Sequence, residues 1–245
     1  MKILYRISES SNKIHEDNRA WQKKPEYATK KNCLLNVIKN FPKSEIVLFV
    51  DQITDETLQW LKTLNLQIVK INEGSEAKSF RCIIDYAIQN YSNDQLVLLQ
   101  EDDYLYINRP EYKMMEALQY ADYVTGYLHP DKFIGKDFGG NPFVERNNES
   151  ELTRVYKTSD HFWMVTNSTT NTFLTKVKTL KEDYNIFMDG TKSLIHTDDF
   201  SNFIRLREKG RKLLQPIPSL ASHCLIGFEA PLNANIINSW KEAVK

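Results

Sequence analysis

The feature that most constrains the fold of this chain is the regular alternation of short apolar runs with helical segments over its first 110 residues. The apolar runs have the length and composition of buried strands and lie at residues 2–7, 44–50, 66–71 and 95–100. Between them, residues 29–41, 54–64 and 76–91 carry apolar side chains at helical spacing. Strands of this length that alternate with helices predict an α/β fold with a mostly parallel sheet flanked by helices.

After residue 110 the alternation becomes less regular, and no composition shift marks a domain boundary. We therefore predict one domain over residues 1–245 with an irregular C-terminal half. The elements expected there are helices at 110–121 and 169–183, the second with threonine capping, strands at 122–128 and 161–167, and long loops or a hairpin at 129–160. A further amphipathic helix is expected to follow Asp198 and Asp199, and the run IPSLAS before His223 is strand-like.

The charge and composition argue against several classes of function. The 32 basic residues balance the 32 acidic ones, so we expect neither a nucleic-acid binder nor a membrane-surface binder. No window approaches the ~18 apolar residues of a transmembrane helix, and the N-terminus lacks the apolar core of a signal peptide. A cytoplasmic protein is therefore expected. Cys33, Cys82 and Cys224 are widely spaced and predict neither a disulfide framework nor a zinc site.

Polar residues follow directly on several of the predicted strands. Ser8, Asp51 and Asn72 each come after an apolar run, and the fourth run leads into the acidic run Glu101–Asp103. Ligands of parallel sheets bind at this carboxyl edge. Because like charges repel at this spacing, either a positive group sits among the three acids or all three face water. The glycine patterns of dinucleotide-binding and P-loop proteins are absent.

Four motifs, taken in order, resemble a GT-A glycosyltransferase, most like the broad family 2 type. They are IVLFVDQITDETLQWLK, EGSEAKSFRCIIDYA, LVLLQEDDYLY and HTDDFSNFIRLREKG, within residues 3–105 and 196–224. The third is similar to the DxD-type strand end in a Glu-Asp-Asp form, and the fourth to the acidic pair and helix that carry the catalytic base. Gln52 and Ile53 depart from the family's second-strand loop, and Phe80 and Cys82 depart from its usual neighbours of Arg81.

The resemblance implies a GT-A fold, with a Rossmann-like sheet and a nucleotide-sugar half at 1–110 and an acceptor half at 111–245. It implies a nucleotide-diphosphate sugar as donor, a glycan or other hydroxyl as acceptor, and Mn²⁺ or Mg²⁺ as cofactor. Asp103 is then the metal ligand, Asp102 binds the ribose or a metal-bound water, and Glu101 supports them. The alternative for this run is a solvated acidic turn.

Other residues take roles at the donor site by the same resemblance. Asp51 would contact the nucleobase, although an acid that caps the next helix explains it equally well. Ser8 and, more weakly, Arg6 would contact the nucleotide. Lys78 and Arg81 would face the diphosphate, unless they form an ordinary solvated basic face.

At the acceptor side, the resemblance makes Asp199 the catalytic base, with Asp198 beside it, in an inverting transfer. A helix N-terminus favours an ionised carboxylate, which is the form a base needs; plain helix capping is the alternative. His223 would complete the metal shell or be structural. Trp163 and the Thr169–Thr172 group could contact the acceptor, although a buried core tryptophan is the simpler interpretation.

Two other functions stay open at this level. A nucleotidyltransferase would share the alternating first half and the acidic strand end, but such enzymes usually open with a glycine-rich loop, and residues 6–18, RISESSNKIHEDN, contain no glycine. A non-catalytic sugar- or nucleotide-binding protein would share the fold, although the acids kept at 101–103 and 198–199 argue against it.

Overall fold

The computed structural model describes residues 1–9, 24–107, 109–135, 137, 140–142, 146–147, 150–151 and 153–230. Most of the glycine-free stretch after the first strand, residues 10–18, lies outside the described residues. The first half contains the predicted elements in the predicted order: β1 (Lys2–Ser8), α1 (Lys30–Asn40), β2 (Glu45–Asp51), α2 (Asp55–Thr63), β3 (Gln67–Ile71), α3 (Glu76–Asn90) and β4 (Leu96–Gln100).

The helices of the first half begin where a hydroxyl side chain satisfies an otherwise free backbone N–H group. Thr29, Thr54 and Ser75 accept hydrogen bonds from the N–H groups three residues ahead of them, at the starts of α1, α2 and α3. Thr54 and Ser75 follow the ends of β2 and β3 within four residues. The caps therefore fix where each helix leaves the sheet edge.

The second half contains more strands than expected. Its elements are β5 (Tyr104–Tyr106), α4 (Pro110–Ala117), β6 (Tyr123–Val124), β7 (Arg146–Asn147), β8 (Ser150–Glu151), β9 (Val155–Lys157), β10 (Phe162–Thr166), β11 (Phe173–Lys176), α5 (Val177–Glu182), α6 (Tyr184–Gly190), α7 (Asp199–Glu208), β12 (Leu213–Ile217) and β13 (Ala221–His223). The strand expected at 122–128 is only two residues long, and β5 and β9 were not predicted.

The prediction of one helix over residues 169–183 is wrong for its first part. Residues 173–176 form β11, which pairs antiparallel with β4 and places Phe173 opposite Leu99. Phe173 and Leu174 are fully buried there. An unpaired edge of β4 would leave a row of backbone N–H and C=O groups without partners. Pairing that edge outweighs the threonine-rich capping signal, and the helix starts only at Val177.

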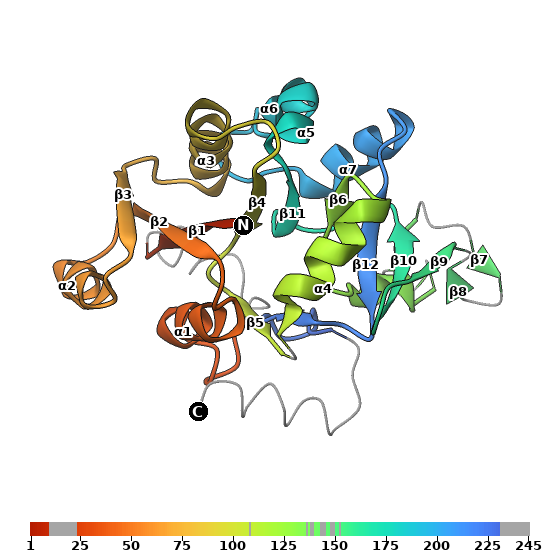
Figure 1. Cartoon of the computed structure of the whole chain (residues 1–245), viewed down its shortest axis with the longest axis horizontal. Coiled ribbons are helices and arrows are strands. Elements are labelled where there is room, and N and C mark those ends of the chain that lie inside the picture. The colour runs from red at the N-terminus through yellow and green to blue at the C-terminus, as the bar shows by residue number, and fades with distance from the viewer. Residues whose placement is uncertain are drawn as a thin grey trace.

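The sheet has nine strands in the order β3-β2-β1-β4-β11-β6-β12-β10-β9. The first four are parallel, since β1 pairs with both β2 and β4, and β2 pairs with β3. β11 and β10 run antiparallel to their neighbours. The predicted α/β class with flanking helices is therefore confirmed, and the second half extends the sheet with antiparallel strands instead of being wholly irregular (Figure 1).

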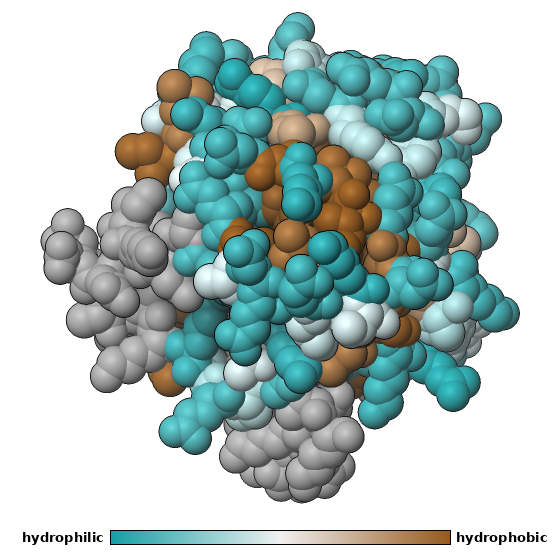
Figure 2. Space-filling model, turned by 90° about the vertical axis from the view of Figure 1, so that its left-hand side faces the viewer, coloured by the Kyte–Doolittle hydropathy of each residue, from teal (hydrophilic) through white to brown (hydrophobic). Residues whose placement is uncertain are grey.

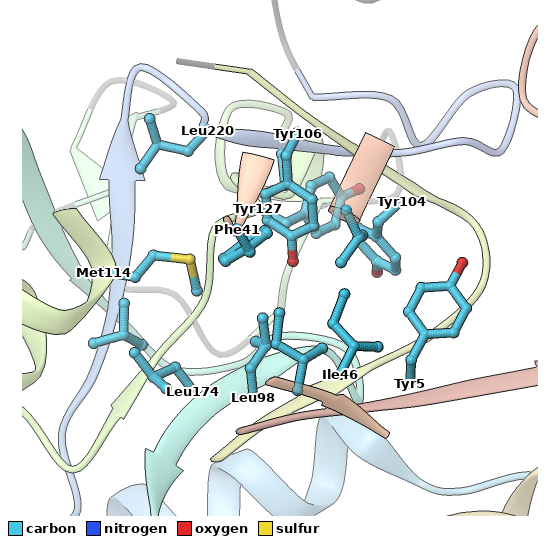
Figure 3. Close-up of a cluster of buried hydrophobic side chains, with 14 of the residues drawn as sticks. Tyr5, Phe41, Ile46, Leu98, Tyr104, Tyr106, Met114, Tyr127, Leu174 and Leu220 are labelled. Atoms are coloured by element: carbon cyan, nitrogen blue, oxygen red, sulfur yellow. The ribbon is translucent and has the colours of Figure 1, made fainter. Parts of the chain in front are cut away.

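Helices cover both faces of the sheet and form two buried clusters. One face packs against α1, α2 and α4 through Leu34, Leu61 and Met114, among others. Within this cluster Phe41 meets Tyr106 edge to face, with ring centroids 4.9 Å apart (Figure 3). The other face packs against α3, α5, α6 and α7. Trp163 is fully buried, which confirms the core interpretation of this residue.

The edge of the sheet at β3 is less covered. Ile68, Val69 and Ile71 are half-buried, and Figure 2 shows apolar side chains gathered on the side of the molecule where α2 and β3 lie. Exposed Lys70 interrupts this run, and a lysine on an edge strand discourages pairing with another chain. Within the described ranges, no helix combines the length and the apolar character needed to cross a bilayer.

Candidate active site

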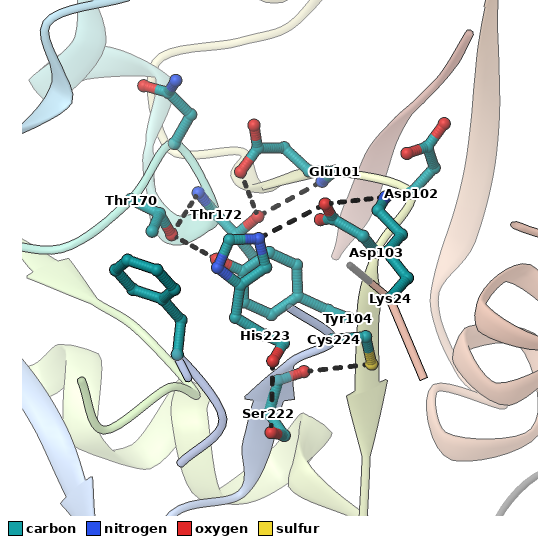
Figure 4. A network of polar contacts seen from close by, with 12 residues as sticks. Lys24, Glu101, Asp102, Asp103, Tyr104, Thr170, Thr172, Ser222, His223 and Cys224 are labelled. Atoms are coloured by element: carbon teal, nitrogen blue, oxygen red, sulfur yellow. Dashed lines mark hydrogen bonds and ion pairs between the residues drawn. The ribbon is translucent and has the colours of Figure 1, made fainter. Parts of the chain in front are cut away.

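The acidic run lies at the carboxyl edge of the parallel strands, in the turn that joins β4 to β5. β13 pairs antiparallel with β5 and sets His223 opposite Tyr104. The imidazole of His223 stacks on the ring of Tyr104 with centroids 4.8 Å apart. Strand pairing thus brings a residue 120 positions away in sequence into contact with Asp103 (Figure 4).

Asp102 anchors the end of β1. Its Oδ2 accepts the backbone N–H of Ser8 at 3.0 Å and pairs with the ammonium of Lys30 at 2.6 Å. Lys30 also donates to the carbonyl oxygen of Ser8. The buried carboxylate therefore ties β1, β4 and α1 together at the predicted nucleotide site.

Asp103 has a lysine and a histidine against one of its oxygens. Lys24 Nζ lies 3.1 Å and His223 Nε2 3.3 Å from Asp103 Oδ2. Burial alone would raise the pKa of Asp103, but the charges of Lys24 and His223 hold it well below its ordinary value. Its other oxygen, Oδ1, is buried and has no hydrogen-bond partner among the described residues. The positive groups among the acids are therefore side chains of the chain itself.

Glu101 faces the opposite side of this turn. Its Oε2 accepts the hydroxyl of Thr172 at 3.3 Å, and Thr170 accepts the hydroxyl of Tyr104 at 2.7 Å. Burial and the negative charges of Asp103 and Glu76 raise the pKa of Glu101 well above its ordinary value, and Asp199 acts in the same direction. Of the threonines expected near the acceptor, Thr172 thus contacts the acidic run, and Thr170 contacts the tyrosine that follows it.

No sequence pattern singles out Glu76, although it hydrogen-bonds to two other segments at the candidate site. Its Oε1 accepts the amide of Asn171 at 3.0 Å and the backbone N–H of Thr197 at 3.4 Å, and its Oε2 lies 3.1 Å from His196 Nδ1. Glu76 is the first residue of α3, where an acid is common because it favours the helix dipole. Because that position is ordinary, the sequence does not indicate that Glu76 joins the start of α3 to Asn171 and to the segment 196–197.

Asp198 and Asp199 divide the two roles considered for them. Asp198 caps α7, because its Oδ1 accepts the N–H of Ser201 at 3.1 Å. Burial, followed by the charge of Glu76, raises the pKa of Asp199 to about 7. The expectation that the helix N-terminus would favour the ionised form is therefore wrong in its net direction, since burial and neighbouring carboxylates outweigh the dipole.

The predicted donor residues at α3 have partners of their own. Asp51 is fully buried and accepts the hydroxyl of Ser79 at 2.7 Å and the backbone N–H groups of residues 73 and 74. It braces the start of α3, while Thr54 caps α2. Arg81 donates to the hydroxyl of Thr191 at 2.8 Å, and Lys78 is exposed. None of these three contacts the acidic run among the described residues.

A small cavity opens between β1, β4 and α3, beside the acidic run. Arg6, Glu76, Glu101 and Asn171 form its polar wall, and Phe80 lies on its apolar side. Arg6 was a weak candidate for nucleotide binding, and its position beside Glu101 makes it a part of the same site.

A divalent cation would find two protein ligands here. In the part of the chain that is described, no three His, Cys, Asp or Glu side chains converge to hold a metal by themselves. Asp103 and His223 do lie together, and the buried Oδ1 of Asp103 has no partner among the described residues. Magnesium-type sites commonly use one or two side chains and complete the shell with substrate phosphates and water. The pair therefore fits such an ion, with Lys24 as its competitor.

No protein-family model matches the chain, and no curated protein sequence matches it. Among solved structures, it is similar to 4-diphosphocytidyl-2C-methyl-D-erythritol synthase, with a TM-score of 0.50, 8% sequence identity, and coverage of 100% of this chain and 98% of that chain. The chain shares the fold of that synthase, a mostly parallel sheet flanked by helices.

Two further structures are similar to this chain at lower scores. The galactosyltransferase LgtC in complex with donor and acceptor sugar analogues has a TM-score of 0.47 and 10% identity, over 88% of this chain and 73% of that chain. The bifunctional IspDF from Campylobacter jejuni has a TM-score of 0.43 and 11% identity over 88% of this chain. This chain spans about half, 48%, of the IspDF chain. The fold alone does not choose between sugar transfer and nucleotidyl transfer.

Proposed function

We propose that this protein transfers a sugar from a nucleotide-diphosphate sugar to a hydroxyl group of an acceptor. The observation that carries the proposal is Asp199, a carboxyl group with a pKa of about 7 at the start of α7. Its negative charge contributes to the raised pKa of Glu101, which supports a place for Asp199 beside the acidic run. A general base works best when its pKa lies near the working pH.

In the proposed reaction Asp199 accepts the proton of the acceptor hydroxyl as the hydroxyl oxygen attacks the anomeric carbon. The bond between that carbon and the diphosphate oxygen breaks, and the nucleoside diphosphate leaves with the electron pair. One displacement inverts the configuration at the anomeric carbon. Glu76, held by His196 and Asn171, keeps the negative potential that raises the pKa of Asp199.

The leaving diphosphate needs positive charge, and the chain offers it at the acidic run. Lys24 and Lys30, now paired with Asp103 and Asp102, lie where a diphosphate at the sheet edge would meet them. A Mn²⁺ or Mg²⁺ ion held by Asp103 and His223 would supply Lewis-acid stabilisation of the leaving group. By this assignment residues 1–110 bind the donor and residues 111–245 supply the base and the acceptor site within one domain.

Nucleotide binding tests the proposal first. Thermal unfolding is measured with UDP, GDP, TDP and CMP, each with and without Mn²⁺. A nucleotide at a hundred times its dissociation constant should stabilise the fold by about 2.7 kcal/mol. Asp103→Ala should abolish the metal-dependent part of the shift, whereas the exposed control Asp94→Ala should keep it. A shift that is equal in Asp103→Ala and wild type would remove Asp103 from the site.

The reaction itself is tested by product analysis. Release of nucleoside diphosphate from a nucleotide sugar, together with a glycosylated acceptor, is the expected result. Release of pyrophosphate from a nucleoside triphosphate and a sugar phosphate would instead establish nucleotidyl transfer. No turnover by a protein that still binds nucleotides would favour the non-catalytic binding function.

A further inference from the structure

Arg6 is a buried guanidinium that makes no hydrogen bond or ion pair within the described residues. It is 9% exposed and its Nε has no hydrogen-bond partner, although its positive charge acts on Glu101 and partly offsets the rise in the pKa of that carboxyl group. Burying a charged group without hydrogen-bond partners is unfavourable, so natural chains keep such a group mainly where it has a function. An anion would satisfy this donor most strongly.

The position of Arg6 shows where that anion would lie. Leu4 belongs to the cluster packed under α3, and Arg6, two residues further along β1, points to the same face of the sheet. Glu101 follows β4, the neighbouring parallel strand, and both side chains line the small cavity that also borders Glu76 and Asn171. The free space inside the cavity is small, so it would admit one small group of a ligand and not a whole sugar ring.

Hydrogen bonding in the described part of the cavity wall leaves Arg6 without an acceptor, although its charge acts on Glu101. Glu76 receives hydrogen bonds from Asn171 and Thr197 and lies against His196. Glu101 receives the hydroxyl of Thr172. Within the described part of the wall, the acids therefore have donors and Arg6 alone lacks an acceptor.

The positive groups of the site fall into two sets. Lys24 and Lys30 pair with Asp103 and Asp102, next to the end of β1 and the start of α1. Arg6 lies on the α3 side, next to Glu101. A donor diphosphate suits the two lysines, which leaves Arg6 for a second negative group on the same substrate.

We propose that this cavity binds a carboxylate of the transferred sugar, so that the donor is a nucleotide-diphosphate hexuronate or a similarly acidic sugar. The inference rests on the proposed function and names the substrate class of that site. A guanidinium matches a carboxylate with two parallel hydrogen bonds, which makes arginine selective for this group. Arg6 is then the specificity-determining residue for the sugar.

Calorimetric binding of UDP, UDP-glucose and UDP-glucuronate tests the assignment, with another base if the nucleotide survey selects one. Arg6→Met should weaken binding of the uronate roughly 10- to 100-fold, the range for a charge-assisted hydrogen bond, and change the other two ligands less than about twofold. Arg6→Lys should recover part of the loss. The control Arg207→Met, on the exposed side of α7, should leave the affinity for all three ligands unchanged.

Two outcomes of this panel would overturn the inference. Equal weakening of all three ligands would assign Arg6 to the diphosphate. No weakening of any ligand would make Arg6 a purely structural residue. Unliganded Arg6→Met is expected to fold about as stably as wild type, because it removes a buried charge that makes no hydrogen bond or ion pair within the described residues.

A second measurement keeps the inference apart from the proposed function. The Nε–H signal of Arg6 in an ¹⁵N NMR spectrum, assigned by its loss in Arg6→Lys, should shift on addition of sodium glucuronate and stay in place with glucose. If no nucleotide binds, the proposed function fails, while this shift would still support a carboxylate site. If nucleotides bind but neither glucuronate nor UDP-glucuronate moves the signal, the inference fails alone.

Discussion

At the scale of single residues, the site is governed by competition for carboxylate oxygens. Asp103 Oδ2 is shared by Lys24 and His223, and Asp102 Oδ2 by Lys30 and the backbone of Ser8. Each lysine neutralises an acid that a substrate or a metal ion would also engage. Ligand binding at this edge therefore includes breaking an existing ion pair.

Removing Lys24 should strengthen metal binding. Lys24→Met removes one of the two partners of Asp103 Oδ2 and lowers the positive charge around it, so Mn²⁺ should bind about fivefold more tightly, as expected from the loss of one competing ion pair of about 1 kcal/mol. Electron paramagnetic resonance of free Mn²⁺ measures the affinity directly. The control is Lys31→Met, which changes an exposed lysine at the start of α1. Unchanged affinity in Lys24→Met would show that the two cations use different atoms.

The pKa of Asp199 predicts opposite effects of pH on activity and on stability. Its folded-state value, about 7, lies above the ordinary 3.8, so the folded chain holds this proton more tightly than the unfolded chain. The stability that it contributes is present at low pH and is lost as the pH rises from about 4 to 7. Transfer needs the ionised base, so the rate should rise up to about pH 7 and then level off.

Asp199→Asn separates these effects. The variant should bind the donor, lose transfer, and gain thermal stability relative to wild type at pH 8 but not at pH 4. Melting curves and initial rates across this range are the measurement. A variant that is destabilised at every pH would instead assign Asp199 to helix capping alone.

The sequence predicts a site residue only where its immediate neighbours in the chain mark it as unusual. The acidic run is recognisable in the sequence, because three adjacent carboxylates after a buried strand repel one another and are therefore unusual. Glu76 and Lys24 carry no such signal, since an acid at a helix start and a lysine in a polar stretch are ordinary. Their roles come from Asn171, His196 and Asp103, which only the tertiary fold brings near.

At the scale of elements, β11 decides the architecture. It is four residues long and joins the parallel strands to the second half of the sheet by pairing with β4 and β6. Phe173 lies between the rings of Tyr123, Phe187 and Phe203, with centroids 5.3 to 5.6 Å away. A short strand with three threonines in the four residues before it has no periodicity long enough to distinguish it from a helix start.

Truncating Phe173 should therefore be severe. Phe173→Ala leaves a void among buried aromatic rings and should cost about 3–5 kcal/mol, measured by chemical denaturation. Phe162→Ala on β10 removes the same atoms from a side chain that is 52% exposed and should cost less than about 1 kcal/mol. Similar losses for both variants would show that β11 is not where the core is fixed.

At the scale of the whole molecule, we expect the two halves to unfold together. β11, from the second half, fills the place next to β4, and β13 holds His223 against Asp103. A fragment of residues 1–110 would expose one side of β4 and should lack a cooperative transition, while the chain 1–245 should melt in one step with equal calorimetric and van't Hoff enthalpies. A cooperative melt of the fragment would divide the chain into two domains.

The alternation of the first half was predictable because each strand and helix there is long and locally patterned. The second half was not, since β6, β9 and β13 have two or three residues each and are defined by their neighbours. The GT-A resemblance named the acids as candidate site residues but gave no indication of β11. The pairing of β11 depends on a strand more than seventy residues earlier.

The order of strands in the sheet also determines how long β4 waits for its neighbour during synthesis. β4 ends at residue 100, but the strand that covers its open side begins at residue 173. At about 5–20 residues per second, a ribosome needs roughly 4–15 s to make the intervening segment. During that interval the nascent chain displays an apolar strand with an unpaired edge, the kind of surface that chaperones shield and that sticks to other chains. Slow codons within residues 101–172 would lengthen this exposure, whereas the same codons after residue 176 would not.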